Sequence, residues 1–171
     1  FNVDLINDVG RCIGEDCLAM GYSGLYGPGI NMHRTAYSGR NFEYYAEDPF
    51  IAGTICAAEV QGIQSKGVYV YLKHVALNDS ETSRRGVNTW LNEQTAREIY
   101  LEVADKAITD GGAWDVMTGF NRWGATWCGA NQNLLTGFLR EELGMRGMCI
   151  TDFSGSSQYM DCLLYTSDAA D

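Results

Sequence analysis

The sequence predicts an α/β fold, an incomplete (β/α)8 TIM-type barrel. Helix-like and strand-like segments alternate along the chain, which is typical of a parallel sheet. Each strand-like segment ends in polar residues: Asn31 and Arg34, Lys73 and His74, Asn121 and Arg122, and Asp152. Polar residues at all the strand ends suit a barrel whose site lies on that face. A doubly wound sheet is the alternative, although the chain has no GxGxxG or Walker-type loop to support a nucleotide site.

The first half of the chain predicts two helices and two strands. Residues 2–20 form a helix that ends at Gly21, and its apolar stripe consists of Val3, Ile6, Val9, Ile13 and Cys17. Residues 24–31 follow as a short glycine-rich strand and loop. Residues 49–66 form the second helix, because Pro49 suits a first helical turn and Gly67 suits a helix end. Residues 68–74 form the second strand.

The second half repeats this alternation. Residues 92–110 predict a helix capped by Asn92, and residues 114–119 predict a strand. A helix over 132–143 stops at Gly144. Residues 148–151 then form a strand in which Met148, Cys149 and Ile150 are apolar with no polar alternation, as in a sheet covered on both faces. This strand delivers Asp152 to its tip, where the acid must be solvated, paired or used. Capping of a following helix is the alternative role for this side chain.

Composition limits the classes of partner. The chain has 171 residues, 46% of them hydrophobic and 20% charged, which suits one globular core. The net charge of −10 excludes nucleic acid and anionic membrane surfaces as expected partners. No apolar run approaches the length of a membrane span.

Cysteine and histidine usage indicates neither a disulfide scaffold nor a metal site. The six cysteines show no CxxC spacing, and two histidines exclude a His-rich metal site, so we expect no metal or cofactor. Four cysteines lie in apolar segments and are expected to be small buried thiols: Cys12, Cys17, Cys56 and Cys149. A reducing, cytoplasmic compartment is favoured, but localisation stays open because a native N-terminus is not identifiable.

The last ten residues differ from the rest. Residues 162–171 correspond to the translation of a transposon-type sequencing-library adapter. We therefore expect residues 1–161 to be a partial barrel domain, and the natural protein to continue beyond residue 161.

Five blocks of sequence resemble glycoside hydrolase family 3, in that family's order and spacing. They cover residues 26–34, 38–53, 73–85, 116–122 and 144–152. The chain is similar to the β-glucosidase branch, because Val75-Ala76 follows Lys73-His74 where the N-acetylglucosaminidase branch has Pro-Gly. The resemblance implies a (β/α)8 barrel accompanied by an α/β sandwich domain. It also implies retaining hydrolysis of terminal β-linked glycosyl residues in a glycoside or oligosaccharide, through a covalent intermediate.

The resemblance also implies roles for individual residues. Asp152 matches the family's nucleophile, whereas the acid/base belongs to a second domain that this chain lacks. The expected sugar-binding residues are Arg40, Lys73, His74, Arg84, Phe120 and Phe153. His33 and Arg34 are expected to be structural. Phe120 stands where many members have Tyr, Phe153 where Trp is frequent, and Val75 where Phe is usual. The family's early acidic residue is expected upstream of Phe1.

Non-catalytic interpretations of the same residues stay open at this point. Arg40 could pair with Glu43 or Glu47 on the surface, and Lys73-His74 could be a solvated strand end. The chain could also be a sugar-binding barrel that has lost its partner carboxylate and hydrolyses nothing. An α/β protein unrelated to sugars leaves the order of the blocks unexplained.

Overall fold

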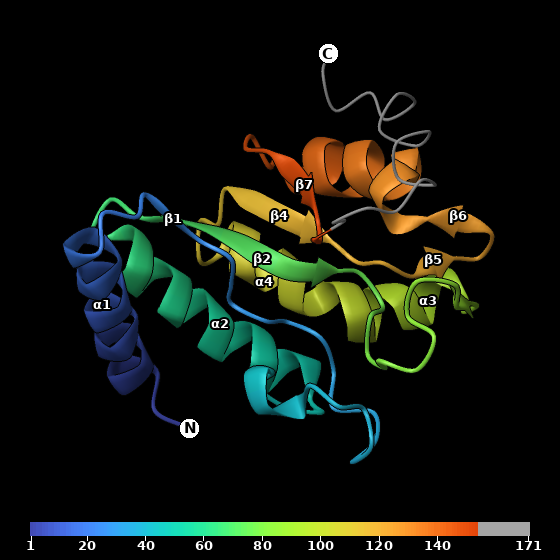
Figure 1. Cartoon of the computed structure of the whole chain (residues 1–171), viewed down its shortest axis with the longest axis horizontal. Coiled ribbons are helices and arrows are strands. Elements are labelled where there is room, and N and C mark those ends of the chain that lie inside the picture. Colours follow the sequence, from blue (N-terminus) through green and yellow to red (C-terminus); the bar gives the residue numbers. More distant parts are fainter. Residues whose placement is uncertain (154–171) are drawn as a thin grey trace.

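A computed structural model of the chain describes residues 1–153. These residues form a parallel sheet (Figure 1), which has four strands. The strand order is β1 (Gly24–Leu25), β2 (Tyr69–Val75), β4 (Asp115–Thr118) and β7 (Cys149–Thr151). Leu72 of β2 pairs with Val116 of β4, and Met117 pairs with Ile150 of β7. A closed barrel of this type has eight strands, so the described residues supply half of them. The predicted α/β class and incomplete barrel are confirmed.

Helices alternate with these strands. They are α1 (Val3–Ala19), α2 (Pro49–Gln64), the continuous run of α3 (Glu93–Thr95), η2 (Ala96–Leu101) and α4 (Glu102–Thr109), and finally η4 (Asn133–Glu142). In η2 and η4 the backbone has the wider π-helical winding. Two short 3-10 turns complete the set, η1 (Asn41–Glu43) and η3 (Cys128–Ala130). Every predicted helix is present, with ends within two residues of the prediction. Within residues 1–153 no helix is both long and apolar enough to cross a membrane.

Side-chain caps define where the helices begin. The Oδ1 atom of Asn2 accepts the amide hydrogen of Leu5 at 3.0 Å, and Asn92 does the same for Thr95 at 2.8 Å. Both bonds satisfy amides that have no partner inside the helix. The cap predicted at Asn92 is therefore confirmed.

The segment 24–31, predicted to be a short strand and loop, has a strand of only two residues, Gly24–Leu25. Regular pairing stops at Leu25, and Pro28 has no amide hydrogen to donate. Contact with β2 then resumes, because Lys73 donates its amide hydrogen to the Pro28 carbonyl at 3.0 Å and accepts one from Ile30 at 2.6 Å. This second contact carries Asn31 to the tip of β2.

A second, small sheet was not predicted from the sequence. It joins β3 (Asn88–Thr89), β5 (Arg122–Trp123) and β6 (Thr126–Trp127). Strands of two residues carry no periodicity that a pattern could reveal. The sheet ties the loop after β2 to the loop after β4, since β3 pairs with β5 in parallel.

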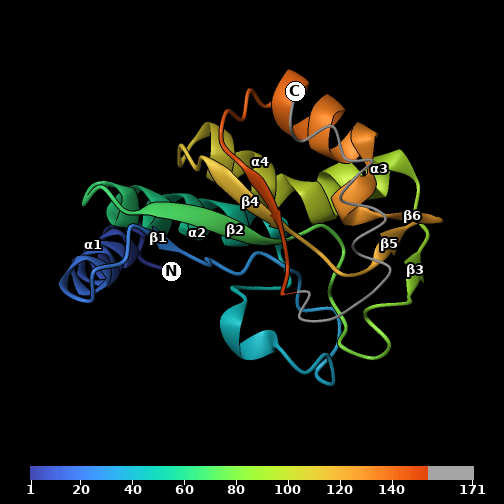
Figure 2. The same cartoon turned by 45° about the horizontal axis from the view of Figure 1, so that its top comes forward.

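The hydrophobic core lies between the sheet and its helices. Val70, Leu72 and Val116 of the strands are fully buried, and Val60, Val103 and Leu139 of the helices are buried in the same hydrophobic cluster. Figures 1 and 2 both place η4 beyond β7, and α1 with α2 near β1 at the opposite end of the sheet. The helices therefore follow the order of the strands.

The predicted apolar stripe of the first helix is partly wrong. Val3 and Val9 are 45% and 41% exposed, whereas the buried face of α1 consists of Gly10, Gly14 and Cys17. A Cβ atom on Gly10 would overlap the carbonyl oxygen of Glu59 in α2. The two backbones approach so closely that glycines, rather than large apolar side chains, form the contact.

Two of the four cysteines expected to be buried lie elsewhere. Cys12 is exposed, because it projects from α1 away from the glycine face, and Cys149 is only half-buried. Cys17 and Cys56 are buried as predicted, and burial raises the pKa of the Cys56 thiol.

Candidate active site

A cavity of about 350 Å³ opens at the C-terminal ends of the four parallel strands. Its lining residues are Tyr26, Arg40, Lys73, His74, Met117, Thr151, Asp152 and Phe153. Five of the seven predicted site residues are among them, and the two that are not are Arg84 and Phe120. Tyr26, Met117 and Thr151 were not assigned a site role from the sequence. The available signals were their position at or next to a strand end and their place within the five sequence blocks.

Asp152 directly follows β7, and its side chain is 14% exposed. One carboxylate oxygen, Oδ1, accepts the backbone amide hydrogen of Phe153 at 2.6 Å. The other, Oδ2, is buried and accepts no hydrogen bond within the described part of the chain. The nearby His74 Nε2 atom is 3.5 Å away, which is too long for a hydrogen bond. Whether Asp152 also caps a helix depends on residues outside the described range.

His74 is buried, with 1% of its surface exposed, and Asn31 fixes its backbone from both sides. The His74 amide donates to Asn31 Oδ1 at 2.8 Å, and Asn31 Nδ2 donates to the His74 carbonyl at 3.0 Å. Burial, together with the charges of Arg40 and Lys73, lowers the pKa of the imidazole to about 3. The ring is therefore neutral at physiological pH.

The surroundings of this neutral ring indicate which nitrogen carries its hydrogen. Nδ1 lies 3.4 Å from the hydroxyl oxygen of Tyr44. Burial raises the pKa of that phenol, so the hydroxyl stays protonated and can donate. Asn31 Oδ1, which accepts the His74 amide hydrogen and has a second lone pair, also lies 3.2 Å from Nδ1. We assign the ring hydrogen to Nε2, because a lone pair there would face the Asp152 carboxylate.

Three of the predicted basic residues belong to one ion network, which we define as Lys73, Glu43, Arg40, Glu81 and Arg84. Glu43 accepts from Arg40 Nε and lies 3.1 Å from Lys73 Nζ. Glu81 lies 3.9 Å from Arg40 and 2.9 Å from Arg84. The alternative prediction for Arg40 was a surface ion pair with Glu43 or Glu47, and the pair with Glu43 does form. Both side chains are less than one-fifth exposed, however, and Arg40 lines the cavity, so the pair is not an ordinary surface contact.

Electrostatics keep Glu43 ionised. Burial raises the pKa of a carboxyl group, but hydrogen bonds and charges from Arg40 and Lys73 outweigh this effect and lower the pKa of Glu43. Neither Glu43 nor Glu81 was assigned a site role from the sequence. The available signal was their place within blocks that also contain Arg40 and Arg84.

Phe120 supports Arg84 and does not line the cavity. The ring is buried, with 3% of the residue exposed, and the Arg84 guanidinium carbon lies 4.7 Å from its centroid. Arg85 approaches the same ring at 5.3 Å. Both distances fit cation–π contacts. Arg84 is therefore linked to the cavity residue Arg40 through Glu81, and its guanidinium lies over the Phe120 ring.

His33 and Arg34 have the structural surroundings expected of them. His33 Nε2 lies 2.9 Å from the Asn41 carbonyl and 3.1 Å from the Tyr44 carbonyl, so it holds the loop that carries Arg40 and Glu43. The Arg34 guanidinium lies over the Tyr100 ring at 5.7 Å. Neither residue lines the cavity.

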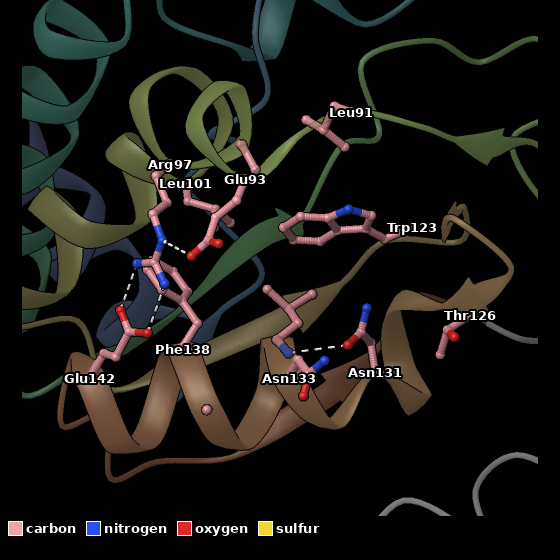
Figure 3. A pocket seen from close by; sticks show the side chains of 13 residues that line it. Leu91, Glu93, Arg97, Leu101, Trp123, Thr126, Asn131, Asn133, Phe138 and Glu142 are labelled. Carbon is pink, nitrogen blue, oxygen red and sulfur yellow. Dashed lines mark hydrogen bonds and ion pairs between the residues drawn. The ribbon is translucent and has the colours of Figure 1, made fainter.

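A larger depression of about 610 Å³ lies between α3 and η4 (Figure 3). Arg97 crosses one end of it and donates to Glu142 at 2.6 and 2.8 Å and to Glu93 at 2.9 Å. No predicted site residue lines it. Its charged groups pair with one another, whereas the smaller cavity holds a carboxylate oxygen without a partner among the described residues. The smaller cavity is therefore the candidate active site.

Comparison with known proteins shows the family of the chain. Residues 1–170 match the family model described as the glycosyl hydrolase family 3 N terminal domain. The chain belongs to glycoside hydrolase family 3. The match extends into residues 162–171, but the boundary predicted after residue 161 lies outside the described residues and stays a prediction.

Relatives within family 3 include several β-glucosidases. Thermostable β-glucosidase B of Acetivibrio thermocellus is 39% identical over 150 residues, which are 88% of this chain and 20% of that protein. An exo-α-(1→6)-L-arabinopyranosidase of Bifidobacterium longum is 37% identical over 153 residues, 90% of this chain and 20% of the relative.

Solved family 3 structures have the same fold. β-Glucosidase 3B from Thermotoga neapolitana in complex with glucose superposes with a TM-score of 0.90 at 36% identity, covering 98% of this chain and 23% of that one. The chain thus spans about one-fifth of the length of the curated relatives it matches.

Proposed function

We propose that the protein is a retaining β-glycosidase of the β-glucosidase type, with Asp152 as its nucleophile. The observation that carries this proposal is Asp152, which lines the cavity and whose Oδ2 atom has no hydrogen-bond partner in residues 1–153. A nucleophilic carboxylate needs such a free oxygen, and a site that only binds sugar does not.

The reaction proceeds in two displacements. Asp152 Oδ2 attacks the anomeric carbon, the bond from that carbon to the leaving oxygen breaks, and a carboxylic acid protonates the leaving oxygen. This step forms a glycosyl ester on Asp152. A water molecule then attacks the same carbon as the acid's conjugate base takes its proton, which releases the sugar with its original anomeric configuration and restores the carboxylate.

The acid/base is proposed to come from a segment outside residues 1–153. Retaining enzymes place two carboxyl groups about 5–5.5 Å apart, yet Asp152 is the single carboxylate among the described residues that line the cavity. Glu43 is nearby but unsuited to be the acid, because its pKa is lowered and both its oxygens contact cations. A second domain, as the family resemblance implies, would supply the group.

Arg40, Lys73 and His74 are proposed to bind the sugar hydroxyls. All three line the cavity with Asp152, and charged donors form strong hydrogen bonds. Phe153 is 80% exposed at the cavity edge and offers a ring face. A β-D-glucosyl residue is the proposed glycone. An α-L-arabinopyranosyl residue is the second candidate, because relatives with that activity are nearly as similar to this chain.

A labelling experiment tests the proposal. The longest natural reading frame that contains this chain is expressed, and the protein is treated with a 2-deoxy-2-fluoro-β-glucosyl inactivator. We expect one glycosyl label on the peptide that contains Asp152, and no label in Asp152→Asn. A folded protein that takes no label and hydrolyses no aryl β-glucoside, β-xyloside or α-L-arabinopyranoside would contradict the proposal and favour the non-catalytic sugar-binding barrel.

A further inference from the structure

We infer that Glu43 is a positioning residue that keeps the nucleophile free, because it holds the cationic groups of Lys73 and Arg40 away from Asp152. This inference rests on the proposed glycosidase function. It concerns a residue outside the predicted set of sugar-binding and catalytic groups.

The arrangement of charges in the cavity motivates the inference. Lys73, Arg40 and Asp152 line the same cavity of about 350 Å³. A partly buried carboxylate beside two cations would ordinarily pair with one of them. No such pair forms in the described structure, and Asp152 Oδ2 accepts no hydrogen bond there. Both cations instead contact Glu43, Lys73 at 3.1 Å and Arg40 through its Nε atom.

The backbone around Glu43 holds its carboxylate in place before any sugar binds. Glu43 ends the short turn η1, and the loop before it turns at Gly39, which has a φ of +89°. Ser38 Oγ donates to Asn41 Oδ1 at 2.5 Å, and Asn41 Nδ2 donates to the Thr35 carbonyl at 2.8 Å. The Glu43 side chain is 17% exposed, so water screens its ion pairs less than those of a surface residue.

Charge counting shows what removal of Glu43 would do. The ion network contains three cations, Lys73, Arg40 and Arg84, and two carboxylates, Glu43 and Glu81, which leaves an excess of one positive charge. Asp152 balances that excess. Of its other described neighbours, His74 is neutral, and the cavity residues Met117 and Thr151 carry no charge. Without Glu43 the excess becomes two, and Lys73 loses the partner that holds it.

Released cations would slow the first displacement. An ammonium group bonded to Asp152 Oδ2 occupies the lone pair that must attack the anomeric carbon, and it lowers that oxygen's nucleophilicity. It also removes Lys73 from the sugar hydroxyls. Glu43→Gln should therefore reduce the rate of glycosylation of Asp152 as well as the affinity for substrate.

The test compares wild type, Glu43→Gln, Glu43→Asp and Glu47→Gln, all in the longest natural reading frame. Glu47 is the matched control, because it is exposed in the same loop and forms no ion pair within the described residues. The measurements are the rate of labelling by the 2-fluoroglucosyl inactivator and kcat/KM as a function of pH. Thermal melting verifies that each variant is folded.

We expect Glu43→Gln to be labelled about 100-fold more slowly than wild type. We also expect its acidic limb of kcat/KM to move about one pH unit lower, because the unbalanced cations favour the charged form of the nucleophile. Glu43→Asp keeps the negative charge, but its shorter side chain does not reach Lys73 and Arg40. We therefore expect slow labelling of this variant, with the acidic limb of kcat/KM at the same pH as in wild type. Glu47→Gln should match wild type in both measurements.

Several results would overturn the inference. Labelling of Glu43→Gln at the wild-type rate would do so, as would slow labelling with an unmoved acidic limb, which would indicate a merely structural role. If Glu43→Gln does not fold, labelling of Glu43→Asp at the wild-type rate overturns it. A wild-type protein that is neither labelled nor active would instead contradict the proposed function, so the two failures are distinguishable.

Discussion

The Nε2 atom of His74 lies 3.5 Å from the Oδ2 atom of Asp152, although the two residues lie at the ends of strands that are not neighbours. His74 is in β2 and Asp152 follows β7, with β4 between them. The buried imidazole is neutral because its pKa is lowered to about 3. The proposed nucleophile thus faces an uncharged donor that is close enough to bond a shared sugar hydroxyl.

The low pKa of His74 predicts a pH dependence of stability. The pKa of a histidine in an unfolded chain is near 6.5. Between about pH 6.5 and pH 3 the unfolded chain therefore binds a proton at His74, whereas the folded chain does not. The stability linked to His74 is therefore complete above about pH 6.5 and is lost progressively as the pH falls toward 3. We expect the melting temperature to fall less between pH 7 and pH 4 in His74→Gln than in wild type. Both proteins are measured in the longest natural reading frame. Parallel pH curves would contradict this expectation.

Phe120 is predicted to act through Arg84. Replacement by Leu removes the ring face that lies 4.7 Å from the guanidinium, a contact of about 1 kcal/mol, or about fivefold in binding. We expect Phe120→Leu to raise KM for an aryl β-glucoside about fivefold with little change in kcat. Phe120→Tyr keeps the ring and should retain the wild-type KM. A change confined to kcat would place Phe120 in a different role.

The crossing of α1 and α2 is predicted to depend on glycine. A Cβ atom at Gly62 would overlap the carbonyl oxygen of Asn7, whereas one at Gly137 in η4 would meet nothing within 4 Å. Gly62→Ala should destabilise the protein by about 1–3 kcal/mol. Gly137→Ala should be neutral or stabilising by up to about 1 kcal/mol, because alanine favours helix. Thermal melting of the two variants checks these two expectations, and equal melting temperatures for Gly62→Ala and Gly137→Ala would contradict them.

The 171-residue chain by itself is predicted to hydrolyse no aryl β-glucoside and to be poorly soluble. Its described cavity lining contains one carboxylate, Asp152, and retaining hydrolysis requires two. Large apolar side chains on α1 are also exposed, among them Leu5 at 59% and Leu18 at 51%. Colour release by the purified chain, abolished by Asp152→Asn, would disprove the first part. Sedimentation after expression tests the second.

Long periodic segments were predictable because their signals are local. The helix over Pro49–Gln64 begins at a proline, and Gly67, whose φ is +81°, lies shortly after its end. The proline and the glycine are both visible in the sequence. The small sheet of β3, β5 and β6 was not predictable, since its two-residue strands are specified by contacts between distant loops. The exposure of Cys12 and Val9 was missed for a similar reason. The buried face of α1 is determined by glycine contacts with α2, and not by the periodicity of apolar residues in the sequence.

The sequence by itself determined the alternation of strands and helices, the place of Asp152 at a strand end, and the motifs that identify the family. These properties depend on residue type and on near neighbours in the chain. Only the tertiary structure decided that Glu43 holds Lys73 and Arg40, that Phe120 lies beneath Arg84, and that His74 is neutral. Ion pairs and pKa values depend on burial and on distances of a few ångströms, and folding sets both between residues far apart in the chain.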